Sequence, residues 1–167
     1  MGRRKRKLSS AKKNADPIFF HQEGLSGSLE PEESSDPLVR SSPALTPEGR
    51  ELVSFITTDD GDDLIVAYAV ELEEPGEIAS LILLRTPKYE GFLRPEERGV
   101  QVSHELHSDV EDELLLSIVV DGLQVDIETT VGGYRLDLSR VDRGEIEATT
   151  AVLRRMRRYG GFELDLR

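Results

Sequence analysis

The chain contains no cysteine. It therefore has no disulfide, no thiolate ligand for a metal and no cysteine nucleophile, which excludes disulfide-stabilised scaffolds and thiol enzymes. This absence favours a reducing compartment, and we expect a cytoplasmic protein. Long apolar runs are also missing: none approaches the roughly 18–20 residues of a membrane-spanning helix. The basic start is not followed by the apolar segment of a secretory signal, so we expect neither a membrane span nor a secretory leader.

Sequence motifs of the common enzyme classes are missing as well. There is no Gly-x-Ser-x-Gly elbow, no P-loop, no dinucleotide fingerprint and no His-Glu-x-x-His. The chain has only three histidines, and its 33 Asp and Glu residues make paired carboxylates uninformative about acid–base catalysis. We therefore favour a non-enzymatic role, assign no catalytic residue and expect no cofactor.

Acidic residues dominate a chain whose formal net charge is −12. Seven of the 21 Lys and Arg residues lie within residues 1–13, which hold no acidic residue, so the remainder carries 14 basic against 33 acidic residues. Phosphate binding needs a positive surface, so this acidic body argues against broad nucleic-acid binding by the folded part. It favours partners that are basic.

Residues 1–45 have the composition of a disordered tail, because they contain too few apolar residues to offset the entropy of ordering. The tail divides into a basic arm (1–13), an apolar segment (18–25) and an acidic linker rich in Ser and Pro (26–45). The arm either only improves solubility or tethers the protein to RNA, DNA or another acidic surface. Its densest cluster comprises Arg3, Arg4, Lys5, Arg6 and Lys7.

The apolar segment of the tail places Phe19, Phe20 and Leu25 in otherwise polar surroundings. It either folds back onto the domain or docks on a partner, for example by adding a strand to a sheet. Both interpretations remain open from the sequence.

Residues 46–167 are predicted to form a single α+β domain. We expect an antiparallel sheet of about seven strands, mostly a meander, with one long C-terminal helix packed on one face. The helix begins at Ser139 or Asp142 and ends near Tyr159, where two glycines follow. Strands are expected over 52–58, 64–73, 78–85, 100–106 and 162–166, besides the three strands of 113–138. An alternative for the first strand is a helical turn that begins at Thr46.

The central meander, 113–138, has two hairpin signals, Asp121-Gly122 and Gly132-Gly133. A two-residue loop at the first signal pairs Val120 with Leu123, and the second signal pairs Val131 with Tyr134. One face of the meander then becomes apolar while the other becomes polar. The residues expected on the apolar face are Leu114, Leu116, Ile118, Val120, Leu123, Val125, Ile127, Thr129, Tyr134, Leu136 and Leu138.

The strands over 64–73 and 78–85 are apolar on both faces. Such strands are usually covered on both sides. One cover is expected to be the C-terminal helix, and the other is the N-terminal segment, another sheet layer or a second subunit.

The connection over 86–99 is the longest inside the domain, and it is the predicted partner-binding loop. Long connections often carry function, and aromatic residues with Arg are common anchors of interfaces. The alternative is that its apolar residues only anchor the loop on the sheet. The predicted contact residues are Lys88, Tyr89, Phe92, Arg94 and Arg98.

The end of the helix is rich in arginine: Arg154, Arg155, Arg157 and Arg158. These side chains either complement the helix dipole or form an anion-binding patch. If the 86–99 loop lies beside them, its cations join the patch.

Two groups of residues resemble metal sites. His104 and His107 have Asp109, Glu111, Asp112 and Glu113 nearby, but residues 104 and 107 of one strand face opposite sides. The loop 59–63 is rich in Asp but lacks the spacing and final Glu of an EF-hand. We assign no metal ligand to either group.

The leading hypothesis is a non-enzymatic macromolecule-binding module, such as an adaptor, chaperone-like or regulatory protein, with a protein partner. The first alternative is a nucleic-acid-associated accessory protein that uses the basic arm and the Arg-rich helix end. The second is a small metal-dependent hydrolase built around His104 and His107. Homo-oligomer formation is left open.

Overall fold

A computed structural model describes residues 42–105 and 112–167, all of which belong to one compact unit. The described chain forms eight strands, two short 3-10 helices and one α-helix. The elements in order are β1 Glu51–Asp60, β2 Leu64–Glu71, β3 Ile78–Arg85, η1 Pro87–Phe92, η2 Pro95–Glu97, β4 Gln101–His104, β5 Leu115–Asp121, β6 Gln124–Thr129, β7 Gly133–Asp137, α1 Arg143–Arg157 and β8 Glu163–Leu166.

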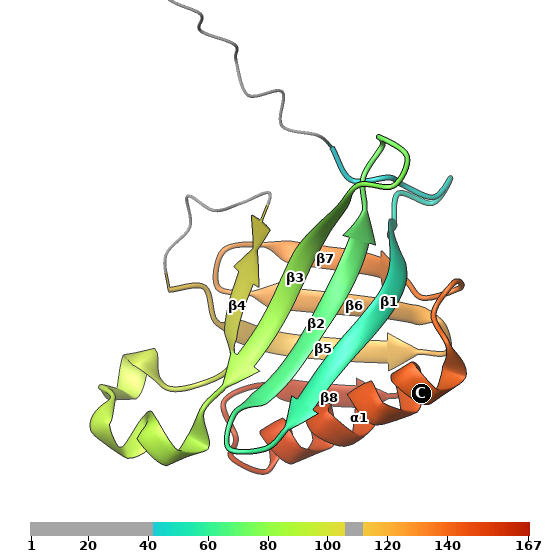
Figure 1. Cartoon of the computed structure of the whole chain (residues 1–167). Coiled ribbons are helices and arrows are strands. Elements are labelled where there is room, and N and C mark those ends of the chain that lie inside the picture. Colours follow the sequence, from blue (N-terminus) through green and yellow to red (C-terminus); the bar gives the residue numbers. More distant parts are fainter. Residues whose placement is uncertain (1–41, 106–111) are drawn as a thin grey trace, which may run out of the picture. The chain divides into compact units, whose positions relative to one another are not determined.

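The eight strands form one mixed sheet in the order β4-β3-β2-β1-β7-β6-β5-β8. Neighbouring strands are antiparallel except for the pairs β1–β7 and β5–β8, which are parallel. The sheet curls into two layers, with β1–β4 in front and β5–β8 behind (Figure 1). The layers meet again where the Val102 N–H donates to the Glu113 carbonyl (2.8 Å) and the Leu115 N–H donates to the Val100 carbonyl (2.9 Å).

The core lies between the two layers and is built from alternate residues of each strand. In β2, for example, Leu64, Val66, Tyr68 and Val70 are at most 1% exposed, as expected for one face of a pleated strand. Burial of each large apolar side chain contributes about 1.5–3 kcal/mol. The other elements supply further buried residues to this core: Val53, Ile56, Leu81, Leu83, Val102, Leu115, Ile118, Val125, Ile127, Leu136, Val152, Leu153 and Met156.

Helix α1 closes one end of this core by packing against β1, β2 and β8. It begins at an Asp142 cap, whose side chain accepts the Gly144 N–H at 2.7 Å. Besides this apolar packing, α1 makes a polar contact with the sheet: the Glu145 carboxylate accepts the Ile56 N–H at 2.8 Å. Only the first residues of β1, Glu51 and Leu52, pair with β7. Beyond them β1 has no strand on that side, and the Glu145 carboxylate supplies the acceptor that the Ile56 N–H would otherwise lack.

The predicted α+β class with one C-terminal helix is confirmed, but the predicted sheet was wrong in detail. The sheet is mixed rather than wholly antiparallel, and it has eight strands rather than about seven. Both parallel pairs join segments that are distant in sequence, and the turn signals used for the prediction report only neighbours along the chain. The strand at 163–166 lies at the sheet edge, as the sequence predicts.

The meander has the predicted strands but different turns. The first turn is centred on Gly122 and Leu123, so Asp121 pairs with Gln124, and Val120 pairs with Val125 instead of Leu123. This shift by two residues preserves which side each strand residue faces, because the side-chain period is two. Leu123 itself lies in the turn and is 50% exposed, so its predicted core position was wrong.

A β-bulge in β5 makes a second part of the predicted meander wrong. The register of β5 shifts between Leu115 and Ser117, which buries Leu115 and leaves Leu116 49% exposed. Leu116 was predicted on the core face, and a bulge inverts that assignment because it adds one residue to one strand. The second turn is also longer than predicted: Glu128 pairs with Gly133, and Val131 is 58% exposed rather than opposite Tyr134.

Replacing Glu145 with Ala is expected to lower the free energy of unfolding by about 1–3 kcal/mol, because the Ile56 N–H loses a charged acceptor. Glu145→Gln keeps an acceptor and should lose less. The matched control is Glu147→Ala, since Glu147 makes only an exposed ion pair with Arg143, which contributes about 0.5 kcal/mol or less. Urea unfolding measures all three. Equal losses for Glu145→Ala and Glu147→Ala would contradict the role of the Ile56 contact.

Candidate interaction surface

Arg85, at the end of β3, is a buried cation that is only 2% exposed. Its guanidinium makes five hydrogen bonds: two to the Glu90 carboxylate (2.6 and 3.0 Å), and one each to the carbonyls of Met156 (3.0 Å), Tyr159 (3.2 Å) and Gly160. Five is the full number of N–H donors of an arginine. The group also lies 5.4 Å from the centre of the Tyr159 ring. Arg85 therefore fixes both η1 and the C-terminal end of α1 to β3.

The predicted partner-binding loop, 86–99, is held by its own cations as well as by Arg85. Lys88 pairs with Asp62 of the β1–β2 turn at 2.9 Å. Arg94 and Glu97 cap η2 reciprocally, and their side chains pair across the turn. The Arg98 guanidinium donates to the Leu93 carbonyl at 3.0 Å. The three predicted contact cations of the loop therefore stabilise the local structure.

The aromatic residues of the loop project into solvent. Phe92 is 88% exposed and Tyr89 is 56% exposed. They lie three residues apart in a 3-10 helix, a spacing at which side chains stand one above the other on the same side. Lys88 lies 5.1 Å from the centre of the Tyr89 ring. We call Tyr89 and Phe92 the aromatic pair.

The C-terminal end of α1 lies beside the 86–99 loop, a proximity that the sequence alone does not determine. Lys88, Arg155 and Tyr159 line one depression of about 360 Å³, together with the β1–β2 turn. Arg155 donates to the Gly61 carbonyl at 3.3 Å and to the Asp60 carbonyl, and its guanidinium is 3.7 Å from the Asp60 carboxylate.

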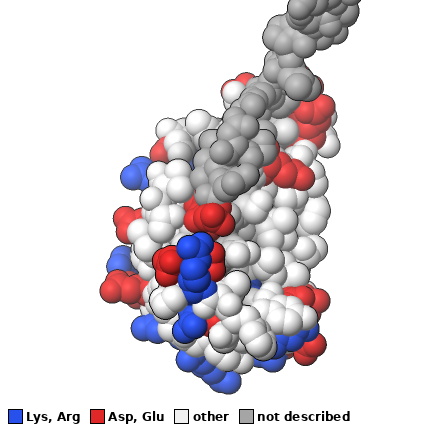
Figure 2. All heavy atoms as spheres, turned by 90° about the vertical axis from the view of Figure 1, so that its left-hand side faces the viewer, with Lys and Arg blue, Asp and Glu red and all other residues white. Residues whose placement is uncertain are grey.

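Arg154, Arg157 and Arg158 of the predicted anion patch are exposed. Figure 2 faces the side of the domain that carries the loop, and it shows Lys and Arg gathered at the lower end with Asp and Glu among them. The acidic β1–β2 turn reduces the positive field at the helix end. The anion patch stays a prediction, with Arg155 already paired.

A buried polar cluster lies where β4 meets β5, and sequence reasoning missed it. The Glu113 carboxylate, 4% exposed, accepts hydrogen bonds from the Thr129 hydroxyl and from the Tyr134 hydroxyl (3.1 Å). The Tyr134 ring stacks on His104, with centroids 5.3 Å apart. Burial and the neighbouring Glu113 carboxylate raise the pKa of Tyr134, so the phenol stays protonated and donates. The only signal in the sequence was that His104, Thr129 and Tyr134 all fall on core-facing positions.

Glu51, at the start of β1, is a second carboxylate near this cluster. Burial raises its pKa, and its Oε2 atom is buried without a hydrogen-bond partner in the described part of the chain. It borders an open groove of about 700 Å³ that Arg50, Asp126 and Arg135 also line. Arg50 and Asp126 pair with each other at 2.8 Å. Arg50 and Asp126 therefore balance each other at this groove, whereas the buried Oε2 atom of Glu51 has no such partner in the described part of the chain.

The predicted metal site around His104 falls partly within the described chain. His107, Asp109 and Glu111 lie outside the described residues, whereas His104 and Glu113 belong to the buried cluster. Among residues 42–105 and 112–167, no group of three or more His, Asp or Glu is arranged to hold a metal ion. The basic arm and the tail residues Phe19, Phe20 and Leu25 also lie outside the described chain.

Replacing Arg85 with Ala is expected to lower the free energy of unfolding by about 3–5 kcal/mol, because it leaves Glu90 and three carbonyls without their donor. Arg85→Lys should not restore stability, since an ammonium cannot form the planar fork. The control, Arg143→Ala, removes a cation that is 92% exposed and should cost about 0.5 kcal/mol or less. Urea unfolding followed by circular dichroism measures each variant, and a stable Arg85→Ala protein would contradict this role.

Replacing Glu51 with Gln is expected to stabilise the protein at neutral pH. The folded-state pKa of Glu51 is raised above its unfolded value, so native stability falls as the pH rises from the unfolded pKa of about 4.3 through the folded one. The gain from Glu51→Gln should therefore vanish below about pH 4. Urea midpoints at several pH values test this, with the exposed Glu163→Gln as control for net charge. A variant that is destabilised at pH 7 would contradict it.

No helix in the described part of the chain is long and apolar enough to cross a membrane. Comparison of the chain with protein-family models, curated proteins and solved structures finds no match. The geometry of the loop, the helix end and the sheet is therefore the basis for inferring function.

Proposed function

We propose that the protein is a non-enzymatic protein-binding module and that the aromatic pair of the 86–99 loop is its contact surface. The observation that carries this proposal is the exposure of Phe92. The chain has only nine aromatic residues, and one of them presents 88% of its surface to solvent. Enclosing such a side chain in a pocket of a partner contributes about 1.5–3 kcal/mol, and aromatic anchors of this kind dominate many interfaces.

The contacts that hold the loop on the domain support the same role. Association is weakened when loops must become ordered, so a surface that is already fixed binds more tightly for the same contacts. Arg85, through Glu90, holds η1 in place, and the reciprocal Arg94–Glu97 cap holds η2. The aromatic pair is thus presented on a pre-organised support.

The charges near the loop determine what kind of partner fits. Because Lys88 pairs with Asp62, and Arg94 pairs with Glu96 and Glu97, most of the positive charge of the loop is balanced within the protein. The net charge of −12 acts over a longer range and accelerates encounters with proteins of positive charge. We infer a partner that has an apolar pocket within a basic surface.

Replacing Phe92 with Ser is expected to reduce partner capture at least tenfold while leaving folding unchanged, because Phe92 makes little contact with its own domain. Tagged full-length protein is cross-linked in its native cells, and the captured proteins are quantified. Val131→Ser is the matched control, since Val131 is 58% exposed in the β6–β7 turn. A partner that is retained by Phe92→Ser and lost with Val131→Ser would contradict the assignment, and so would the absence of any captured protein.

A further inference from the structure

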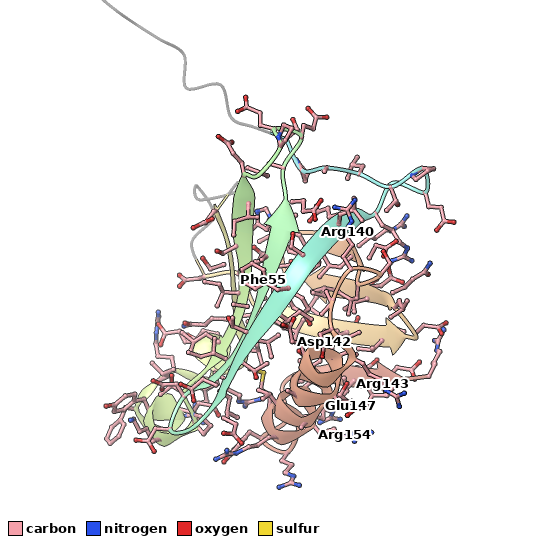
Figure 3. All side chains as sticks on the ribbon, turned by 45° about the vertical axis from the view of Figure 1, so that its right-hand side comes forward. Phe55, Arg140, Asp142, Arg143, Glu147 and Arg154 are labelled. Atoms are coloured by element: carbon pink, nitrogen blue, oxygen red, sulfur yellow. The ribbon has the colours of Figure 1, made fainter. Side chains whose placement is uncertain are left out.

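The outer face of the β1–β4 layer has an apolar middle over β1, β2 and β3, whereas Asp59, Ser80 and the outward residues of β4 are polar. We define this outer face by Phe55, Ile65, Ala67, Ala69, Ile82 and Leu84, which point away from the core. Cross-strand pairing aligns Phe55 with Ala69, Ala67 with Ile82, and Ile65 with Leu84. Phe55 is 42% exposed, and Figure 3 shows it on β1, apart from the charged side chains along α1.

The opposite layer shows that this face is unusual for the protein. Outward positions of β6, β7 and β8 carry charges, such as Asp126, Arg135 and Asp165. Charged residues make up 32% of the chain. On the outer side of β2, however, no charged residue occurs before Glu71, and Asp59 of β1 lies beside its first outward residue, Ile65. Large exposed apolar patches usually mark interaction sites.

The sequence predicted a second cover for these strands, and the described chain supplies almost none on this side. The other layer and α1 cover the inner face. In Figure 1 no described element lies over the middle of β2 and β3. The 86–99 loop reaches only the margin, where Tyr89 and Leu93 share a cavity of about 180 Å³ with Leu84.

We propose that the outer face is the contact between two copies of this chain, which pack sheet against sheet. Two molecules of net charge −12 repel each other, and an uncharged face is where that repulsion costs least. The same face offers no charge to pair with a phosphate or with a strongly basic partner. The small side chain of Ala67 leaves room for the bulky residues of a facing sheet, and a two-fold axis brings the same patch of both copies together.

The size of the face sets the strength of the dimer. The apolar residues lie on three strands, about 4.8 Å apart and about 25 Å long, which present roughly 360 Å² per copy, or roughly 700 Å² in total. This is below the roughly 1,000 Å² of a stable specific interface, so we expect a weak dimer with a dissociation constant on the order of 100 μM. Acidic residues at the margin, including Asp59, Glu71 and Glu105, repel their counterparts. Salt screens that repulsion and should therefore strengthen the dimer.

The test is sedimentation velocity of the full chain from about 1 to 200 μM at two salt concentrations. We expect a monomer–dimer equilibrium that shifts toward dimer in high salt. Ile82→Asp should raise the dissociation constant at least tenfold, because it places like charges in the middle of the contact. Phe55→Glu does the same at a more exposed position, should Ile82→Asp fail to fold. The control is Leu123→Asp, which makes the same kind of change at a residue that is 50% exposed on a distant turn.

Three outcomes would overturn the dimer. The first is a monomer at every concentration, including the case in which a different protein occupies the face. The second is a dimer that none of the outer-face variants weakens. The third is a dimer that weakens in high salt, which indicates pairing of opposite charges instead. The aromatic pair takes no part in these variants, so failure here leaves the loop proposal standing, and the reverse also holds.

Discussion

The buried guanidinium of Arg85 is the constraint on which the arrangement of one end of the domain depends. A buried charge costs several kcal/mol unless its donors are all paired, and here one β-strand cation is satisfied by a 3-10 helix and by the end of α1. The chain after α1 turns close to this guanidinium. Gly160 and Gly161 have φ of +79° and +90°, values that favour glycine. A Cβ on Gly161 would lie 3.6 Å from the Gly99 Cα and 3.8 Å from the Arg85 guanidinium.

This constraint also explains how a loop as long as 86–99 is held against the domain. Loops of this length without regular strands or helices usually retain freedom, because few of their backbone groups are paired internally. Here Glu90 joins the loop to Arg85, and Lys88 joins it to the β1–β2 turn. The polar residues thus hold the backbone, which leaves the aromatic residues as the part of the loop that can contact another molecule.

Much of the core could be predicted from the sequence because strand side chains alternate. In β2 the bulky residues alternate with smaller ones, which separates its two faces, and a turn displaced by two residues, as at Gly122, changes no face. Strand β3 is apolar on both faces, so its order alone does not say which face points inward. Leu116 shows where this reasoning fails. A bulge moves one residue out of the alternation, and it depends on the partner strand, which the local sequence does not describe. The parallel pairs β1–β7 and β5–β8 were not predicted for the same reason, since they join segments that are distant in the sequence.

The candidate sites were less predictable, because composition locates charged residues but not their partners. Lys88 and Arg155 were recognised as cations, yet the carboxylates that pair with them lie in a turn 26 and 95 residues away, respectively. The Glu113 cluster shows the converse. His104, Thr129 and Tyr134 fall on core-facing positions, where a polar residue must find a buried partner, but only the fold brings Glu113 to Thr129 and Tyr134.

The apolar outer face differs from what the composition of the chain would lead one to expect. A chain with 32% charged residues has ample means to place Lys or Glu on a solvated sheet face, as it does on β6 and β8. Apolar residues over several strands are a liability in a protein that stays alone, because they promote unspecific association. The pattern is therefore best explained by a face that is covered when the protein functions. Since the face meets the loop at Leu84, a molecule bound to either surface lies next to the other. Occupation of one surface would then influence access to the second, without any change in the fold between them.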